Sequence, residues 1–257
     1  MSNIKKFRLT SFKNKNEILR LDKISFKYGK KIILDNLDLT LNGGEILGLL
    51  GPNGAGKTTI FNIITGFIAP DFGSVMIKSE KINKWPVSER ALKYRISYVP
   101  QNSGYFADLT VYENLKAIAE ITIENSSYRE EKINTLISKF ELDPIRDIPA
   151  SQISGGERKR LTISLALVSD PKILLLDEPF AALDILTIKS LQEIIVNLQS
   201  ENQISIILCD HNASSLLKVT DTAAIIHNGK VIAKGTPSNL IRNIDARVYF
   251  GTSFKIS

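Results

Sequence analysis

The segment from residue 51 to residue 59 begins with the eight-residue pattern G-x-x-x-x-G-K-T, which is typical of loops that hold phosphate groups. Its residues are Gly51, Pro52, Asn53, Gly54, Ala55, Gly56, Lys57, Thr58 and Thr59. The glycines let backbone N–H groups surround phosphate oxygens without a Cβ clash, and a following helix adds partial positive charge. The Lys57 ammonium is suited to the β- and γ-phosphates of a nucleotide, and the Thr58 hydroxyl to Mg²⁺. An apolar strand pattern precedes this segment and a helical pattern follows it, which favours a phosphate loop over a simple glycine-rich turn.

Two carboxylates, Asp177 and Glu178, follow directly after the apolar run Ile173–Leu176. A strand of this kind would deliver Asp177 beside the metal ion of a phosphate site, and Glu178 would then polarise an attacking water. The alternative is a solvated strand end with no chemical role. The phosphate loop elsewhere in the chain favours the catalytic interpretation.

A second glycine-containing segment, Ser154-Gly155-Gly156-Glu157, follows a stretch that is rich in helix signals. Ser154 is suited to cap a helix that runs on through Leu161, Leu165 and Val168. Its hydroxyl and the N–H groups of Gly155 and Gly156 would form an anion site at the start of that helix. A purely structural cap is the alternative, and it stays open at this point.

Short apolar runs alternate with helical patterns along the chain, which predicts a largely parallel sheet with crossover helices. The expected strands are Ile46–Leu50, Ile173–Leu176, Ser205–Cys209 and Ala223–His227, and Ile18–Phe26 and Ile32–Leu41 are expected as antiparallel edge strands. Helix signals dominate from about residue 102 to residue 153, and we interpret residues from about 102 to 160 as a helical subdomain inserted into the core. The predicted fold class is therefore an α/β core of the phosphate-loop nucleoside triphosphatase type, with an antiparallel β edge and an inserted helical subdomain.

Local signals mark the ends of several elements. Ser127-Tyr128-Arg129-Glu130 has the pattern of a capping box, and Ile133, Leu136, Ile137 and Phe140 then share one helical face. Asn228-Gly229 predicts a hairpin turn between two strands. Thr236-Pro237 predicts the cap and first position of a final helix.

The composition of the chain limits its functional class. It has 257 residues, of which 43% are hydrophobic and 23% charged, which excludes disordered, collagenous and coiled-coil proteins. The net charge of +6 suits an anionic ligand or membrane surface but falls short of a dedicated nucleic-acid binder, so no nucleic-acid partner is expected. A single cysteine excludes an internal disulfide and a cysteine-based zinc site. No run reaches 18 apolar residues, so no membrane span is expected either.

The two ends of the chain are expected to lie outside the folded domain. Residues 1–17 form a basic tail, residues 18–250 the nucleotide-binding domain, and residues 251–257 a short C-terminal tail. The N-terminal tail contains Lys5, Lys6, Arg8, Lys13 and Lys15. We interpret it as a frayed terminus, with weak contact to anionic lipid headgroups as the alternative.

Together these motifs resemble the ATP-binding subunits of ATP-binding cassette (ABC) transporters, over nearly the whole chain. The resemblance implies that Gly51 to Thr59 is the Walker A loop, that Asp177 is the Walker B ligand of Mg²⁺, and that Glu178 is the catalytic glutamate. Ser154-Gly155-Gly156-Glu157 is similar to the family signature, with Ile153 where leucine is usual.

The same resemblance assigns four further residues. It implies that Gln101 contacts Mg²⁺ and water, that His211 holds the γ-phosphate, that Tyr28 stacks on adenine, and that Asp184 lies at a dimer interface. From the residues alone, the alternatives are packing at a strand edge for Tyr28, a surface loop for Gln101 and a helix cap for Asp184. The expected ligands are ATP and Mg²⁺, and the expected catalytic residues are Glu178, His211, Gln101 and Lys57.

The resemblance further implies a head-to-tail homodimer, in which the Ser154 cap of one copy closes over ATP bound by the other. Two transmembrane permease subunits would provide the membrane contact, and the chain would lie peripherally on the cytoplasmic face of a bacterial inner membrane. Tyr105, Phe106 and Tyr112 are candidates for a groove that receives a short helix of such a partner. Core packing is the alternative for each of these aromatic residues.

Several stretches, at residues 48–59, 154–160, 176–181, 210–212 and 247–251, are similar to the lipopolysaccharide-export ATPases of the LptB family. That family implies membrane partners of the LptF and LptG type and extraction of lipopolysaccharide from the inner membrane. The chain departs from it at Ile185, where proline is usual, and in its longer N-terminal tail. Two alternatives remain: the ATPase of a branched-chain amino-acid importer, and a soluble assembly ATPase with no membrane partner.

Overall fold

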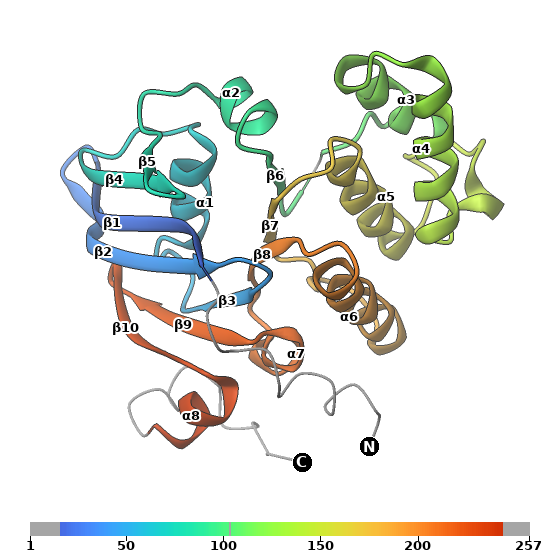
Figure 1. Cartoon of the computed structure of the whole chain (residues 1–257). Coiled ribbons are helices and arrows are strands. Elements are labelled where there is room, and N and C mark those ends of the chain that lie inside the picture. Colours follow the sequence, from blue (N-terminus) through green and yellow to red (C-terminus); the bar gives the residue numbers. More distant parts are fainter. Residues whose placement is uncertain (1–15, 103, 244–257) are drawn as a thin grey trace.

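The computed structural model describes residues 16–102 and 104–243 and places them in two sheets with helices around them (Figure 1). A six-stranded sheet has the order β10-β9-β3-β8-β7-β6, and a four-stranded sheet has the order β2-β1-β4-β5. The larger sheet consists of β3 (Ile46–Leu50), β6 (Ile96–Val99), β7 (Ile173–Asp177), β8 (Ser205–Cys209), β9 (Thr222–His227) and β10 (Lys230–Gly235). The smaller sheet consists of β1 (Glu17–Tyr28), β2 (Lys31–Asn42), β4 (Phe72–Ile77) and β5 (Glu80–Lys81).

The helices follow the strands in an α/β order. They are α1 (Lys57–Thr65), α2 (Val87–Leu92), α3 (Val111–Thr122), α4 (Ser126–Lys139), α5 (Gly155–Leu167), α6 (Ile185–Ser200), α7 (Ala213–Val219) and α8 (Pro237–Arg242), with a 3-10 turn at Asp143–Ile145. The helices α3, α4 and α5 lie between β6 and β7 in the sequence and form the green and olive group in Figure 1. None of the helices in the described part of the chain is both long and apolar enough to cross a bilayer.

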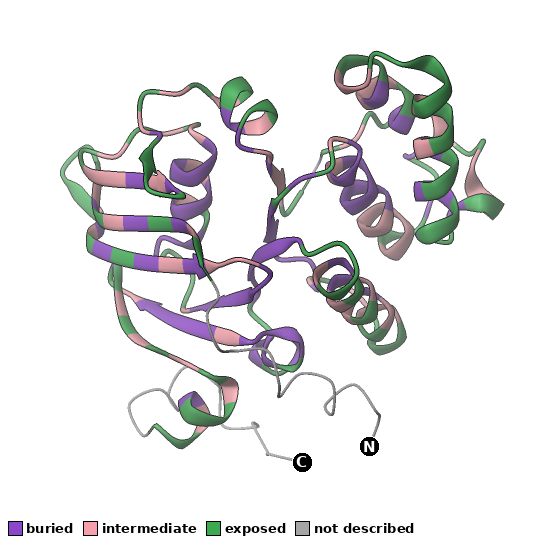
Figure 2. Cartoon of the chain, in the orientation of Figure 1, coloured by how far each residue is buried: buried purple, intermediate pink, exposed green. Residues whose placement is uncertain are grey.

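The central strands are buried on both faces because apolar layers cover the larger sheet from either side (Figure 2). Leu174 and Leu176 of β7 pack into the cluster formed with α3 to α7, whereas Ile173 and Leu175 face the cluster that contains α1 and the smaller sheet. Strands of this kind are expected to be continuously apolar rather than alternating. The predictions of the strands at 46–50, 173–176, 205–209 and 223–227 are confirmed.

The two alternating segments at the N-terminal end are antiparallel strands, as predicted, but only one of them is an edge strand. β1 pairs with β2 on one side and with β4 on the other, so β1 is internal and β2 is the edge. The alternation of β1 arises because Leu19, Leu21 and Ile24 face the core while the opposite face is open. An alternating pattern indicates a strand with one buried face. It does not distinguish a strand at the edge of a sheet from one inside the sheet.

The predicted start of α4 is wrong by two residues. The side chain of Asn125, rather than that of Ser127, accepts a hydrogen bond from a backbone N–H, that of Tyr128, at 2.9 Å. The face formed by Ile133, Leu136, Ile137 and Phe140 is buried as predicted. The hairpin at Asn228-Gly229 and the Thr236 cap of α8 are also confirmed. The residues predicted as tails, together with the stretch at 247–251, lie outside the described residues, except for Asn16 and Glu17.

A buried arginine holds the end of α1 in place. The Arg90 guanidinium is 1% exposed and donates to the carbonyls of Ile63 and Ile64 at 2.7 and 2.9 Å. It also donates to the carbonyls of Asn83 and Trp85. The last carbonyls of a helix lack intrahelical partners, so Arg90 supplies the missing donors. Gly66 ends the helix at φ +86°, and a Cβ there would lie 2.8 Å from the Arg90 Nε.

We predict that Arg90→Ala lowers the free energy of unfolding by roughly 3 kcal/mol, because it leaves buried carbonyls unpaired. Urea denaturation followed by circular dichroism measures this. Arg20→Ala is the matched control, since Arg20 is half-exposed and makes one ion pair, with Glu17 at 3.7 Å; its expected effect is below about 0.5 kcal/mol. Equal midpoints for the two variants would contradict the role given to Arg90.

Candidate functional site

A cavity of about 380 Å³ lies at the carboxyl ends of the parallel strands, where ligands bind in α/β sheets. It is called the phosphate cavity here, and it is lined by Lys31, Ile33, Asn53, Gly54, Gly56, Lys57, Thr58, Thr59, Gln101, Glu178 and His211. The strands β3, β6, β7 and β8 each contribute the segment that follows them. The structure therefore brings together the predicted phosphate loop and three of the predicted catalytic residues.

The phosphate loop turns sharply between β3 and α1. Gly54 and Gly56 have φ values of +76° and +104°, and a Cβ on Gly56 would lie 2.7 Å from a methyl group of Leu34. Only glycine fits both positions without strain. No side chain among the described residues caps α1, so the first N–H groups of the helix are directed at the cavity. The Lys57 ammonium is held at the loop by the carbonyls of Gly51 and Pro52, at 2.7 and 3.0 Å.

The Asp177 carboxylate is the meeting point of four elements. It is 3% exposed, and its Oδ2 accepts hydrogen bonds from the Thr58 hydroxyl at 3.0 Å and the Tyr98 hydroxyl at 3.1 Å. Its Oδ1 accepts from the Cys209 thiol at 2.8 Å. Burial raises the pKa of Cys209 and of Tyr98, and the Asp177 charge raises both further, so each remains a protonated donor. A buried carboxylate requires such partners.

The Glu178 carboxylate lies between the other two predicted catalytic side chains. The Gln101 amide donates to its Oε2 at 2.5 Å, and the His211 Nε2 contacts its Oε1. Glu178 has a left-handed φ of +51°, and its N–H donates to the Cys209 carbonyl at 2.8 Å. A non-glycine residue held in this conformation is a form of strain that concentrates at functional sites.

Asp210 and Lys159 support the site and were not singled out from the sequence. The Asp210 carboxylate accepts from the N–H groups of Phe180 and Asn212, at 2.9 and 2.8 Å, so it ties the loop after β7 to the loop after β8. Burial raises the Asp210 pKa. The Lys159 ammonium donates to the Gln101 carbonyl at 2.8 Å, and burial lowers its pKa. Asp210 immediately precedes the predicted residue His211. The spacing of residues in the sequence does not predict the contacts of Asp210 with Phe180 or of Lys159 with Gln101, because each joins segments far apart in the chain.

The predicted anion cap at Ser154 lies outside the phosphate cavity. The Ser154 hydroxyl accepts from the Glu157 N–H at 3.3 Å, and the Glu157 carboxylate accepts from the Ser154 N–H at 2.7 Å, which completes a capping box for α5. Hydrogen bonds from the Ser154 side chain and from the Ser154 N–H lower the pKa of the Glu157 carboxyl group. A Cβ on Gly156 would lie 2.7 Å from a methyl group of Thr187, so the cap lies against the segment that begins at Asp184.

Two further predicted residues stand apart from the cavity walls. Tyr28 is 79% exposed at the end of β1, where it pairs with Lys31, which does line the cavity. Asp184 caps α6 and accepts from the N–H groups of Leu186 and Thr187. Among the described residues, no cluster of three or more His, Cys, Asp or Glu side chains is suited to hold a metal ion. Mg²⁺ does not need one, because substrate phosphates and water complete its shell.

Comparisons with known proteins agree with this geometry. Residues 34–181 match the family model described as "ABC transporter". The lipopolysaccharide export system ATP-binding protein LptB of Haemophilus influenzae is 40% identical over 241 residues, which cover 93% of this chain and 99% of that protein. LptB of Escherichia coli K12 is 38% identical over 231 residues, which cover 89% of this chain and 95% of that protein.

Solved structures extend the agreement to the fold. A dimeric ATP-binding cassette in a post-hydrolysis state bound to ADP and Pi superposes with a TM-score of 0.77 at 26% identity, over 86% of this chain and 99% of that chain. The family model covers more than half of the sequence, and the relatives match it over nearly its whole length. The chain therefore belongs to the ABC transporter family, as one of its ATP-binding, ATP-hydrolysing cassettes.

Proposed function

We propose that this chain is the ATPase that drives export of lipopolysaccharide from a bacterial inner membrane. The observation that carries its ATPase role is the Glu178 carboxylate, which is fixed between Gln101 and His211 at the rim of the phosphate cavity. The cargo is supported by the relatives named LptB, at 38–40% identity over most of the chain. Lipopolysaccharide export is therefore favoured over amino-acid import and over a soluble assembly role.

The proposed mechanism depends on positioning and charge. Lys57 and the N–H groups of the phosphate loop hold the β- and γ-phosphates, Glu178 orients water in line with the γ-phosphate and accepts its proton, and His211 contacts that phosphate. Tyr28 provides an exposed ring at the end of β1 on which adenine can stack.

The donor set at Asp177 fits Mg²⁺. The Thr58 hydroxyl and the Asp177 carboxylate are hard oxygen ligands, and their oxygen atoms are 3.0 Å apart. The Gln101 side chain is close by, since its amide is hydrogen-bonded to the neighbouring Glu178. We assign these three residues as the protein ligands of the ion. Bound Mg²⁺ would neutralise phosphate charge.

The proposed assembly is a head-to-tail homodimer, because Ser154, Gly155 and Gly156 do not line the phosphate cavity of their own chain. Each cap would then close over ATP held by the other copy, with two ATP molecules in a two-fold dimer. Two permeases of the LptF and LptG type complete the transporter and hold the chain at the cytoplasmic face of the membrane.

The helices between β6 and β7 are proposed as the helical subdomain, within a domain that spans residues 18–250. The subdomain is proposed to span residues from about 102 to 160, and its last helix, α5, begins at Gly155 and ends at Leu167. Phe106 is 53% exposed at its start, whereas Tyr105 and Tyr112 pack against the core. The Tyr112 hydroxyl also donates to Glu130 at 2.9 Å, and Arg146 lies over its ring. Phe106 is therefore the aromatic residue proposed to contact a permease.

We predict that Glu178→Gln retains ATP binding within about twofold and lowers turnover by roughly 100-fold or more, because the amide cannot accept the proton of water. Phosphate release measures turnover, and titration with a fluorescent ATP analogue measures affinity. Lys57→Ala is the comparison variant, and it should weaken nucleotide affinity instead. Undiminished hydrolysis in Glu178→Gln would refute the role given to this carboxylate.

We predict that the Ser154 cap acts on the nucleotide of the second copy. Ser154→Arg and Lys57→Ala subunits should each be inactive alone, but an equal mixture contains dimers with one intact composite site. The mixture should therefore recover up to roughly a quarter of the wild-type ATPase rate if the two sites act independently. A mixture as inactive as its components would argue against the composite site, provided that crosslinking shows mixed dimers.

We predict that the tagged chain, purified from detergent-solubilised membranes of its native cell, brings two membrane proteins with large periplasmic domains. Mass spectrometry identifies them, and Phe106→Asp should reduce their recovery without changing the unfolding midpoint of the chain. Recovery of a periplasmic binding protein with two permeases would indicate import instead. A chain recovered only from the soluble fraction would indicate an assembly ATPase.

A further inference from the structure

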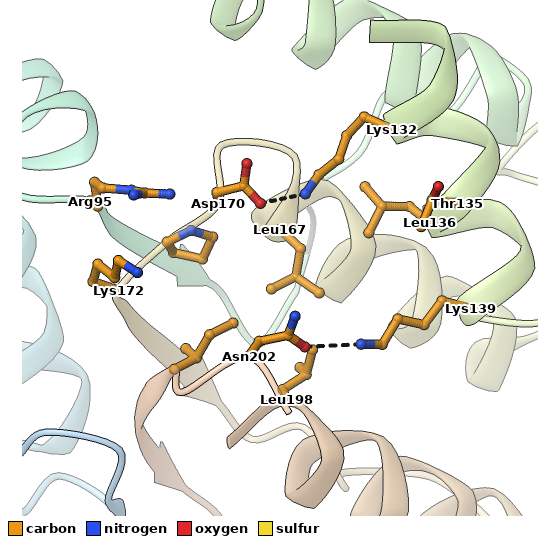
Figure 3. A pocket seen from close by; sticks show the side chains of 12 residues that line it. Arg95, Lys132, Thr135, Leu136, Lys139, Leu167, Asp170, Lys172, Leu198 and Asn202 are labelled. Atoms are coloured by element: carbon orange, nitrogen blue, oxygen red, sulfur yellow. Dashed lines mark hydrogen bonds and ion pairs between the residues drawn. The ribbon is translucent and has the colours of Figure 1, made fainter. Parts of the chain in front are cut away.

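Figure 3 shows a second cavity, of about 260 Å³. It lies at the opposite end of the parallel strands from the phosphate cavity. Arg95 and Lys172 immediately precede β6 and β7, and Ile204 immediately precedes β8. The opposite wall comes from α4, and the ends of α5 and α6 close the cavity through Leu167 and Leu198. None of the described residues lines both cavities, so this site is separate from the proposed nucleotide site.

The lining of this cavity is strongly basic, and we call it the basic cavity. It contains four cationic side chains and one carboxylate, namely Arg95, Lys132, Lys139, Lys172 and Asp170. Figure 3 shows the labelled cations on both sides of the cavity, with Asp170 beside Lys132. An excess of positive charge around a concave site attracts anions.

Two of the cations are already neutralised within the chain. The Lys132 ammonium forms an ion pair with Asp170, whose second carboxylate oxygen accepts from the Tyr128 hydroxyl at 3.4 Å. The Lys139 ammonium donates to the Asn202 amide oxygen at 2.9 Å and lies 3.5 Å from Glu201. The single carboxylate of the cavity is therefore engaged by α4.

The other two cations, Arg95 and Lys172, have no side-chain partner among the residues that the structure describes. They lie beside one another because β6 and β7 are parallel, with Ile96 paired to Ile173. The Arg95 carbonyl accepts hydrogen bonds from the N–H groups of Lys172 and Ile173, at 2.8 and 3.1 Å, which fixes the two backbones together. Two like charges held side by side repel one another, and a bound anion would remove that repulsion.

The floor of the basic cavity is apolar. It consists of the buried residues Leu136, Leu167, Pro171, Leu198 and Ile204. Its volume lies just below the lower end of the range for small-molecule sites, about 300–1,000 Å³. A small molecule with a charged head and a short apolar body would satisfy both the unpaired cations and this floor.

We propose that the basic cavity binds a small organic anion. Its phosphate or carboxylate head lies between Arg95 and Lys172, and its apolar body packs against the apolar floor of the cavity. An occupant would contact the strand β7, which leads to Asp177, together with the end of α5, which begins at the Ser154 cap. The site is thus placed to couple an anionic metabolite to both halves of the nucleotide machinery. The binding claim itself does not depend on the proposed transport function.

The test uses the full chain and two probes, 4-fluorophenyl phosphate and 4-fluorobenzoate, followed by fluorine NMR relaxation at constant ionic strength. At least one anion should bind saturably, with a Kd on the order of 1 mM for a ligand of this size. Arg95→Gln and Lys172→Gln should each weaken binding roughly tenfold, because each removes a charge-assisted hydrogen bond. Neutral 4-fluorobenzyl alcohol should bind at least tenfold more weakly than the anion.

Two controls separate this site from others. Lys189→Gln removes an exposed lysine of α6 outside the basic cavity and should leave affinity unchanged. Lys57→Ala is expected to weaken anion binding in the phosphate cavity. It should leave binding of the probe in the basic cavity unchanged. Lys172 is exposed, so its variant is expected to fold, and circular dichroism checks Arg95→Gln. Absence of saturable binding, equal affinity in all variants, or loss of binding in Lys57→Ala would each overturn the proposal.

Discussion

The parallel register of β3, β8, β7 and β6 fixes where each group of the proposed nucleotide site lies. Leu49 pairs with Cys209, and Cys209 pairs with Asp177, so the carboxyl ends of these strands lie at one level. The phosphate loop and Glu178 start immediately after their strands, and Gln101 and His211 follow theirs by two residues. Short connections of this kind leave little freedom for the side chains. A slip of one residue would turn each of them to the opposite face of the sheet.

Burial of charge is the second constraint, and it follows from the first. Asp177 is almost fully buried and is stabilised by three donors from different elements: the Thr58 hydroxyl, the Tyr98 hydroxyl and the Cys209 thiol. Lys159 is a buried cation in the same site. Desolvation lowers its pKa, and the negative charges of Asp210, Glu178 and Asp177 act in the opposite direction. Its hydrogen bond to the Gln101 carbonyl joins α5 to the segment after β6. The site is thus polar, enclosed and held in place before a nucleotide arrives, which favours catalysis by preorganised charge.

The sequence predicts what depends on local chemistry and misses what depends on packing. The phosphate loop, the buried strands and the Ser154 cap each follow from neighbouring residues, so spacing alone locates them. The internal position of β1 could not be predicted, because β4, its second partner, is about 50 residues away and leaves no mark on the alternation of β1. The same holds for Lys159, whose contact with Gln101 spans 58 positions. At α4, the capping-box pattern pointed to Ser127, but the side chain of Asn125, two residues earlier, makes the cap.

The phosphate loop and the Ser154 cap, which both present N–H groups suited to an anion, lie in different parts of the chain. This separation is the strongest structural argument for a site that is shared between two copies. The phosphate loop follows β3 in the core, whereas the Ser154 cap begins α5 and packs against Thr187. The capping box uses the Ser154 N–H and the Ser154 hydroxyl, whereas the N–H groups of the two glycines lie in the first turn of α5, where a helix has no intrahelical partners for them. Beside this cap, Ile185 and Leu186 are largely exposed at the start of α6. A helix cap with N–H groups open to a ligand, next to exposed apolar side chains, has the composition of a contact surface, and in the proposed dimer a second copy of the chain would bring a phosphate to it.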